Sequence, residues 1–455
     1  MEPDLVDAVI IGAGAAGLAA ASELRANGRS ILVVEARSRV GGRILTYRDP
    51  AVAVPIELGA EFLHGSTPNT DTIIDRAGLT AIDVAGDSWR ARDGEFRKVD
   101  YWGKVDRVLR KLDEHRMPDR SFSDYLGERA ARKKKSKDAR ARSLAREFVQ
   151  GFHAADPDLV SERWLAVGGD PGKSPDAERT GRLLDGYDRV SAWLAKEVFD
   201  AVELNALVTH VDWKRGDVKV GCRGSHGFQR QFAARTVIVT VPAGVLKADP
   251  GEAGAITFAP EIPVLAAALD GIAMGAVLRI VFSFSERFWE SGLRNAPNKD
   301  GGLRALSFIH SPGAQFPVWW TQFPVRAPVL VGWVGGPPAA ELCTLPDAEI
   351  ERHALHDLAQ HLGSTYEHLA GLVRGCWMYN WEKDPYSRGA YSYAVVGGSG
   401  SARKLARPVE QTIFFAGEAT DTNGHSGTVE GALASGVRAA RGVLQALGVE
   451  HISNQ

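Results

Sequence analysis

Residues 6–35 read VDAVIIGAGAAGLAAASELRANGRSILVVE, and this stretch decides the fold. Its first six residues form a largely apolar run typical of a buried strand, and residues 30–35 form a second run of the same kind. Between them, residues 15–26 have a helical pattern that ends at Asn27-Gly28. A strand, a helix and a second strand in this order predict a βαβ unit, from which parallel sheets are built.

The turn between the first strand and the helix is GAGAAG, residues 12–17, which has the spacing GxGxxG. Glycines here allow a tight turn and let backbone N–H groups approach a pyrophosphate, and the helix N-terminus adds the positive end of its dipole. Glu35 ends the second strand 21 residues after Gly14, where a carboxylate can accept a hydrogen bond from a ribose hydroxyl. Together these features predict a dinucleotide site rather than a purely structural glycine turn.

A second glycine pair, Gly41-Gly42, is followed directly by Arg43. The pair lets the backbone pass close to the same pyrophosphate, and Arg43 then offers it a guanidinium. This extension favours FAD over NAD. The alternative is that Arg43 is a solvated surface arginine.

Length and composition exclude several classes of protein. The chain has 455 residues, of which 44% are hydrophobic and 24% charged, so it is long enough for two domains and is not predominantly disordered. The formal net charge of -2 creates no overall field that would attract nucleic acid or a membrane. The three cysteines form no CxxC pattern and the twelve histidines no metal-ligand pattern. Residues 8–22 lack the basic start of a signal peptide and are too short to span a bilayer. We therefore expect a cytoplasmic protein with no metal, no nucleic-acid partner and no membrane segment.

The remaining chain has a coarse pattern of helices and strands. Residues 79–196 look mostly helical, 347–362 form a helix, and 412–448 form a strand, a glycine-rich loop and a helix from about 429 to 447. Strand-like runs are expected at Ala201–Trp213, Asp217–Cys222, Phe228–Gln231, Arg235–Val241, Val277–Phe284, Leu303–Ile309 and Val329–Trp333. Because no flexible linker separates these parts, the domains are expected to interleave.

Further motifs follow the glycine turns in a fixed order. They are ELGAEFLHG at 57–65, VIVTVPAGVL at 237–246, Met274-Gly275, Phe288-Trp289, WEKDPYSRGAY at 381–391, FAGE at 415–418 and SGTVEGA at 426–432. In these motifs the sequence resembles the flavin-containing amine oxidases, a family that includes monoamine and polyamine oxidases, flavin-dependent histone demethylases and L-amino-acid oxidases. The resemblance implies an α/β fold of two domains: a Rossmann-like FAD domain (1–78, 191–247 and 386–455) interleaved with a mixed α+β substrate domain (79–190 and 248–385).

The resemblance also implies where FAD contacts the chain. Its adenosine is expected at Glu35 and the backbone near Val208, its diphosphate at the glycine turn, Arg43 and Glu418, and its isoalloxazine near Gly59, Ala60 and Thr428. Since a carboxylate would repel a diphosphate, Glu418 is interpreted as accepting from ribityl or ribose hydroxyls, holding a water, or capping a turn. Ala390 stands where some relatives carry a flavin-linked cysteine, so FAD is expected to bind non-covalently. The expected cofactor contacts are Gly12, Gly14, Ala15, Ala16, Gly17, Glu35, Ala36, Arg37, Gly42, Arg43, Gly59, Ala60, Glu61, Val208, Gly417, Glu418, Gly427, Thr428 and Val429.

Three residues are candidates for the chemistry itself. Tyr391 corresponds to one wall of the family's aromatic cage, whereas Thr428 replaces the aromatic residue of the opposite wall. His64 lies where animal polyamine oxidases similarly place a histidine near the amine. Arg279 replaces a lysine that holds a water at the flavin in most relatives, and arginine cannot become neutral. Each has an alternative interpretation: a core tyrosine, a structural histidine, and an arginine displaced from the pocket.

The predicted reaction is oxidation of a primary or secondary amine, a polyamine being one candidate, to an imine, with O2 reduced to hydrogen peroxide. The alternatives are an L-amino-acid oxidase, in which Arg279 would bind the carboxylate, and an amine dehydrogenase with poor O2 reactivity. A binding scaffold is a third alternative, because residues 128–147 contain nine basic and three acidic side chains. Trp319, Trp320 and Trp333 fit either a pocket lining or the core, and the oligomeric state is left open.

Overall fold

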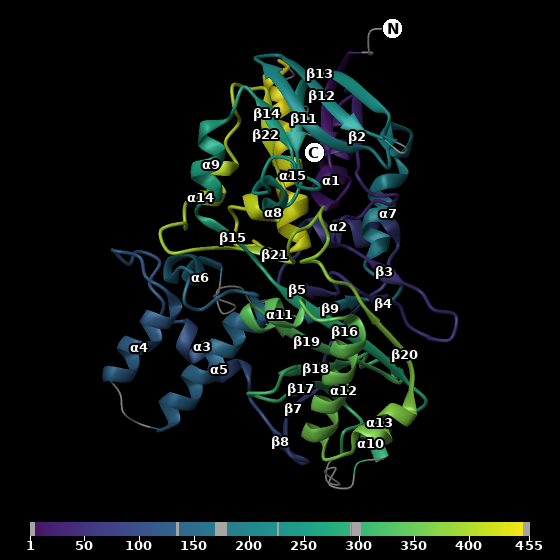
Figure 1. Ribbon diagram of the computed structural model, residues 1–455, viewed down its shortest axis with the longest axis vertical. Coiled ribbons are helices and arrows are strands. Elements are labelled where there is room, and N and C mark those ends of the chain that lie inside the picture. The colour runs from purple at the N-terminus through teal and green to yellow at the C-terminus, as the bar shows by residue number, and fades with distance from the viewer. Residues whose placement is uncertain are drawn as a thin grey trace.

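The computed structural model describes residues 5–132, 136–168, 180–224, 227–291, 293 and 302–448. It confirms the predicted βαβ unit as β1 (Leu5–Ile11), α1 (Ala15–Ala26) and β2 (Ile31–Val34). The two strands pair in parallel, from Ala8 opposite Ile31 to Ile11 opposite Val34. Figure 1 shows α1 beside α15 (Val429–Ala446), so the two ends of the chain meet in one half of the molecule.

The two strands of this unit belong to an eight-stranded sheet. Its order is β10-β2-β1-β13-β12-β11-β14, and β22 pairs with β13 beside this path. The additional strands are β10 (Val202–Glu203), β11 (Leu207–Lys214), β12 (Asp217–Arg223), β13 (Gln229–Val239), β14 (Thr257–Ala259) and β22 (Ile413–Phe415). The two short runs predicted at 228–231 and 235–241 are wrong as separate strands. They form the single strand β13, because β12 and β1 together supply pairing partners along nearly its whole length.

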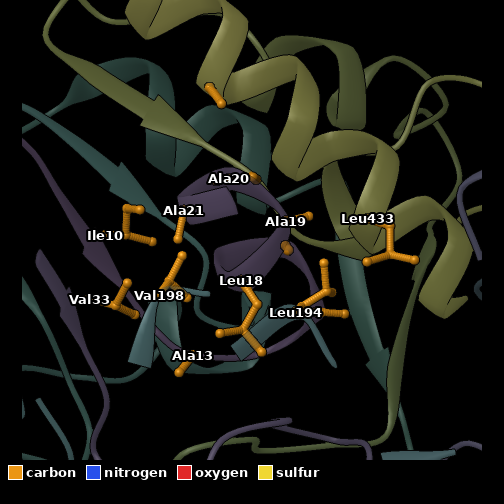
Figure 2. Packing of buried hydrophobic residues seen from close by; sticks show 14 of the residues in the cluster. Ile10, Ala13, Leu18, Ala19, Ala20, Ala21, Val33, Leu194, Val198 and Leu433 are labelled. Atoms are coloured by element: carbon orange, nitrogen blue, oxygen red, sulfur yellow. The ribbon is translucent and has the colours of Figure 1, made fainter. Parts of the chain in front are cut away.

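Small side chains let α1 pack closely against its neighbours. Figure 2 shows Ala19, Ala20 and Ala21 of α1 in a buried cluster with Leu433 of α15. A Cβ added to Gly436 of α15 would lie 2.2 Å from the carbonyl oxygen of Ala16, so the two helices touch through backbone. This close packing fixes the N-terminus of α1 and the C-terminal helix relative to each other.

A seven-stranded sheet forms the other half of the molecule (Figure 1). Its order is β20-β16-β19-β18-β17-β7-β8, where the strands are β7 (Asp87–Arg92), β8 (Glu95–Lys98), β16 (Val277–Phe284), β17 (Leu306–His310), β18 (Val318–Thr321), β19 (Val329–Gly335) and β20 (Val373–Met378). The predicted strand at 277–284 and the predicted helix at 347–362 are confirmed with the same ends as β16 and α12 (Asp347–Leu362), and the strands predicted at 303–309 and 329–333 are confirmed as β17 and β19 with shifted ends.

The prediction that residues 79–196 are mostly helical is partly wrong. The helices α3 (Trp102–Leu109), α4 (Phe122–Arg132), α5 (Ser136–Phe152), α6 (Glu162–Gly168) and α7 (Asp188–Lys196) are present. The same stretch also contributes β7 and β8, and it contains β6 (Ala81–Asp83) and β9 (Thr180–Leu183), which form a small sheet with β5 (Phe62–His64). In β7 only Trp89 and Ala91 are buried, and they alternate with charged or half-exposed residues, which is the period of a strand.

The division of the chain at residue 247 stays a prediction. The segments immediately after it lie on the first sheet, because β14 pairs with β11, and Leu265 of α9 (Pro263–Leu269) packs in the same buried cluster as Val211. Between the two large sheets, β15 (Ile272–Gly275) pairs with β21 (Tyr391–Ala394). In the part of the chain that the structure describes, no helix combines the length and apolar character needed to cross a bilayer.

Candidate active site

Two glycine turns face each other at the carboxyl end of β1. A Cβ at Gly17 would lie 1.9 Å from the carbonyl oxygen of Gly12, so this position of α1 accepts only glycine. Gly42 has a φ of +58°, and its added Cβ would lie 3.2 Å from the Cα of Gly14. Because the glycines that face each other carry no side chain, the two turns approach through backbone, which is the arrangement that a pyrophosphate requires. The residues present therefore fit a dinucleotide.

Glu35 lies directly beside this cradle. Its carboxylate accepts hydrogen bonds from the backbone N–H of Ala13 at 2.8 Å and of Arg37 at 2.8 Å. The N–H of Ala206 donates to the Glu35 carbonyl at 2.9 Å, which brings the start of β11, with Val208, to the same edge. Each carboxylate oxygen has a second lone pair, so Glu35 can still accept from ribose hydroxyls. The Arg37 guanidinium pairs with Asp384 at 2.8 Å, and its other terminal nitrogen lies 3.9 Å from the Glu35 carboxylate.

Arg43 and Glu418 form an ion pair at 3.0 Å. The same guanidinium nitrogen donates to the Ala390 carbonyl at 2.7 Å. The other carboxylate oxygen of Glu418 accepts from the Ser392 hydroxyl at 2.6 Å and from the backbone N–H of Gly427 at 3.1 Å. Glu418 is thus neutralised by Arg43 and joins three segments, which removes the repulsion expected from a bare carboxylate beside a diphosphate.

The N-terminus of α15 lies against Tyr391. Thr428 is its N-cap and accepts from the Gly431 N–H at 3.0 Å. Gly427 has a φ of +77°, and a Cβ there would lie 3.3 Å from a ring carbon of Tyr391. The helix dipole therefore places positive potential beside this ring.

Phe152 connects Tyr391 with His64. The Tyr391 hydroxyl donates to the Phe152 carbonyl at 2.6 Å, and the His64 ring lies 5.2 Å from the Phe152 ring in an edge contact. Burial lowers the pKa of His64 to about 4 and raises the pKa of Tyr391, so both side chains are neutral at pH 7. Sequence reasoning missed Phe152, because it ends a helix outside every motif.

Arg279 is buried on β16 and is held by residues of the ELGAEFLHG segment. It donates to the Gly59 carbonyl at 2.7 Å and forms an ion pair with Glu61. Glu61 also pairs with buried Arg182 at 2.8 Å and accepts from the Trp320 indole N–H at 3.1 Å. Burial lowers the pKa of each arginine to about 10, so both remain cationic at pH 7. Glu61, which was expected to contact the cofactor, thus has its carboxylate committed to two arginines.

The three candidate tryptophans have different surroundings. Trp319 is part of the core and packs against Phe282 and Phe316. Trp320 faces the Arg279 guanidinium at 5.3 Å, and the Trp333 indole N–H donates to the Gly151 carbonyl at 2.9 Å. Trp320 and Trp333 therefore lie near the candidate site, whereas Trp319 does not.

The basic run at 128–147 is divided between α4 and α5, and Lys133, Lys134 and Lys135 lie outside the described residues. Within the described part, Arg129 donates to the Tyr125 hydroxyl at 2.8 Å. Also among the described residues, no group of three or more His, Cys, Asp or Glu side chains could hold a metal ion.

Comparison with known proteins agrees with this geometry. The family model of the flavin containing amine oxidoreductases matches residues 15–444. The chain belongs to this family. It is 30% identical to lysine-specific histone demethylase 1 homolog 3 of Arabidopsis thaliana over 96% of the chain, but it spans only 30% of that protein. It is 28% identical to polyamine oxidase 3 of Oryza sativa subsp. japonica, covering 95% of the chain and 88% of the relative. The structure of wild-type putrescine oxidase bound to putrescine shares the fold of this amine oxidoreductase, with a TM-score of 0.79 at 22% identity over 97% of this chain and 99% of that one.

Proposed function

We propose that this flavin-dependent amine oxidoreductase oxidises a primary or secondary amine to an imine and passes the electrons to O2, giving hydrogen peroxide. The observation that supports this proposal is that neutral His64 and neutral Tyr391 both contact Phe152. These contacts lie next to the N-terminus of α15 and the Arg43–Glu418 pair. This arrangement joins an aromatic wall with two uncharged polar side chains to the segments that would hold a flavin.

FAD, bound non-covalently, would be held by the two glycine turns, Glu35 and the Arg43–Glu418 pair. When bound, it supplies the two-electron acceptor. Support for this choice over a shorter flavin comes from Glu35, whose position beside the glycine turn suits an adenosine ribose. Ala390, whose carbonyl binds Arg43, has no nucleophile for a covalent link.

The protein's own task is to make the amine nitrogen neutral. An alkylammonium with a pKa of about 10.4 must give up its proton at pH 7, which costs about 4–5 kcal/mol. An aromatic, water-poor wall disfavours the cation and lowers this cost. Neutral His64 can accept a hydrogen bond from the nitrogen, because its pKa of about 4 leaves the ring unprotonated.

Arg279 bears on both rival enzymatic reactions. An L-amino-acid oxidase needs a guanidinium that is open to a substrate carboxylate, but one terminal nitrogen of Arg279 binds the Gly59 carbonyl and the other pairs with Glu61. Because both terminal nitrogens of Arg279 are already bound within the protein, an amine is favoured over an amino acid as the substrate. An amine dehydrogenase stays an alternative, because a fixed cation stands in place of a lysine, and the rate at which O2 reoxidises the reduced flavin distinguishes the two reactions.

The rice relative supports a polyamine as one candidate substrate. A cytoplasmic location is also part of the proposal, and it is supported by the free state of Cys222, Cys343 and Cys376.

The test is an anaerobic screen of amines and amino acids for bleaching of the flavin in the purified protein, followed by a peroxide assay in air. We expect bleaching by at least one amine and peroxide in the amount of amine consumed. Bleaching by amino acids alone would favour the amino-acid oxidase. Reoxidation by O2 that is slower than turnover with another acceptor would reject the oxidase label.

A further inference from the structure

A line of aromatic rings runs from the surface to His64. Trp102, the first residue of α3, is 44% exposed, and Phe152, the last residue of α5, is 39% exposed. Their ring centroids are 6.3 Å apart in an edge contact, and each ring also contacts Phe148, at 5.4 Å and 4.8 Å. Phe152 then contacts His64 at 5.2 Å. The site therefore has an aromatic face that extends to the molecular surface.

The rings of this line carry no charge at pH 7. His153, which contacts Phe152 at 5.2 Å, has its pKa lowered by burial to about 4, as does His64. Glu147 is the acidic residue of α5 nearest in sequence to Phe152; burial raises its pKa, and the hydrogen bond that it accepts from the Ser143 hydroxyl and the charge of Arg90 oppose this only in part. In the described chain, the ring contacts of Trp102 and Phe152 are with each other and with phenyl, phenol or imidazole rings.

Behind His64 the line ends in positive charge. Phe62 contacts His64 at 5.6 Å, and the Arg182 guanidinium lies 5.2 Å from the face of the Phe62 ring. Arg182, Glu61 and Arg279 together carry a net charge of +1, and Glu57, with a pKa raised by burial to about 7, offsets only part of it. This excess positive charge disfavours an ammonium group at the His64 end of the line, and the Glu61 carboxylate is already paired with the two arginines.

We propose that the preferred substrate is a monoamine with an apolar aryl or cycloalkyl substituent, and that Trp102 and Phe152 determine this specificity by packing against the substituent. The inference rests on the proposed function, since it takes His64 and Tyr391 as the reacting end of the site. Aromatic walls contribute through the apolar area they cover, and a substituent that loses such a wall typically loses one to two orders of magnitude in catalytic efficiency.

The experiment measures anaerobic flavin reduction in the FAD-loaded enzyme by benzylamine, cyclohexylamine, ethylamine, putrescine and spermidine. We expect efficiencies for the two cyclic amines at least about tenfold above those for putrescine and spermidine. Trp102→Ala should lower the efficiency for the cyclic amines by about tenfold or more, change that for ethylamine less than about twofold, and be largely rescued by Trp102→Phe. The control Phe228→Ala removes an aromatic side chain that is 72% exposed elsewhere and should change none of these values.

The outcomes separate the two proposals. Preference for putrescine or spermidine, or an equal loss for all amines in Trp102→Ala, would overturn the specificity inference and leave the amine oxidase function standing. The first of these results would also indicate that the rings bind a cation instead of an apolar group. If no amine bleached the flavin, the proposed function would fail, and the inference with it.

Discussion

Replacing Glu61 with glutamine should destabilise the protein more than removing either arginine that it binds. Glu61 is 5% exposed and lies between Arg182 and Arg279, which are 5% and 4% exposed. Its carboxylate pairs with Arg182 at 2.8 Å, pairs with Arg279, and accepts from the Trp320 indole N–H at 3.1 Å. Loss of the negative charge leaves two buried guanidinium groups without their shared carboxylate, and Glu57 is the other acidic side chain of the described residues that acts on both.

The magnitude follows from the cost of uncompensated buried charge. Removing one partner of a buried ion pair typically costs about 3–5 kcal/mol, so we expect a loss of this size in the unfolding free energy of Glu61→Gln. Arg182→Met should cost less, about 1–3 kcal/mol, because it leaves a neutral Glu61–Arg279 pair. The main expectation is that Glu61→Gln loses more unfolding free energy than Arg182→Met, because Glu61→Gln leaves two buried positive charges and Arg182→Met leaves a neutral pair.

The assay is equilibrium unfolding in urea, followed by tryptophan fluorescence on FAD-saturated protein at pH 7. Glu203→Gln is the matched control, because Glu203 pairs with Arg230 on the surface, where the two side chains are 35% and 45% exposed. It should change the unfolding free energy by less than about 1 kcal/mol. A loss below about 1 kcal/mol in Glu61→Gln, or a larger loss in Arg182→Met, would refute the reasoning.

Three further predictions concern the surroundings of this cluster and the cofactor cradle. Burial raises the pKa of Glu57 to about 7, so its stabilising contribution is complete below about pH 4 and disappears as the pH rises through 7. The unfolding free energy of Glu57→Gln, measured relative to that of the parent protein by urea unfolding, should therefore rise by about 3 kcal/mol from pH 4.5 to pH 8. If the difference between the two proteins is the same at both pH values, the raised pKa of Glu57 is contradicted. Thr428→Ala removes the cap of α15 and should cost about 1 kcal/mol, whereas Thr428→Ser should restore most of it. Gly17→Ala places a Cβ 1.9 Å from the Gly12 carbonyl oxygen, so the purified variant should retain far less flavin per chain than Gly127→Ala in α4, where the added Cβ meets nothing within 4 Å.

Some features of the fold could be predicted because they are local. The βαβ unit lies within residues 5–34, and its strand and helix patterns appear in adjacent segments of sequence. The strands β7 and β8 were missed within a helical region, because each is short and their stability comes from pairing with β17 and with each other. Short runs of this kind carry little signal of their own.

The sequence by itself determined the glycine turns, the placement of Glu35 after the second strand, and through its ordered motifs the flavin amine oxidoreductase family. Only the tertiary structure decided that Glu61 joins Arg182 to Arg279 and that Phe152 joins His64 to Tyr391. The physical reason is distance along the chain: the Tyr391–Phe152 contact spans 239 residues, and the Arg279–Gly59 contact spans 220. Such pairs arise where elements far apart in the chain pack together, here α5 with β21 and β16 with the loop at Gly59, and no periodicity within a single segment encodes them.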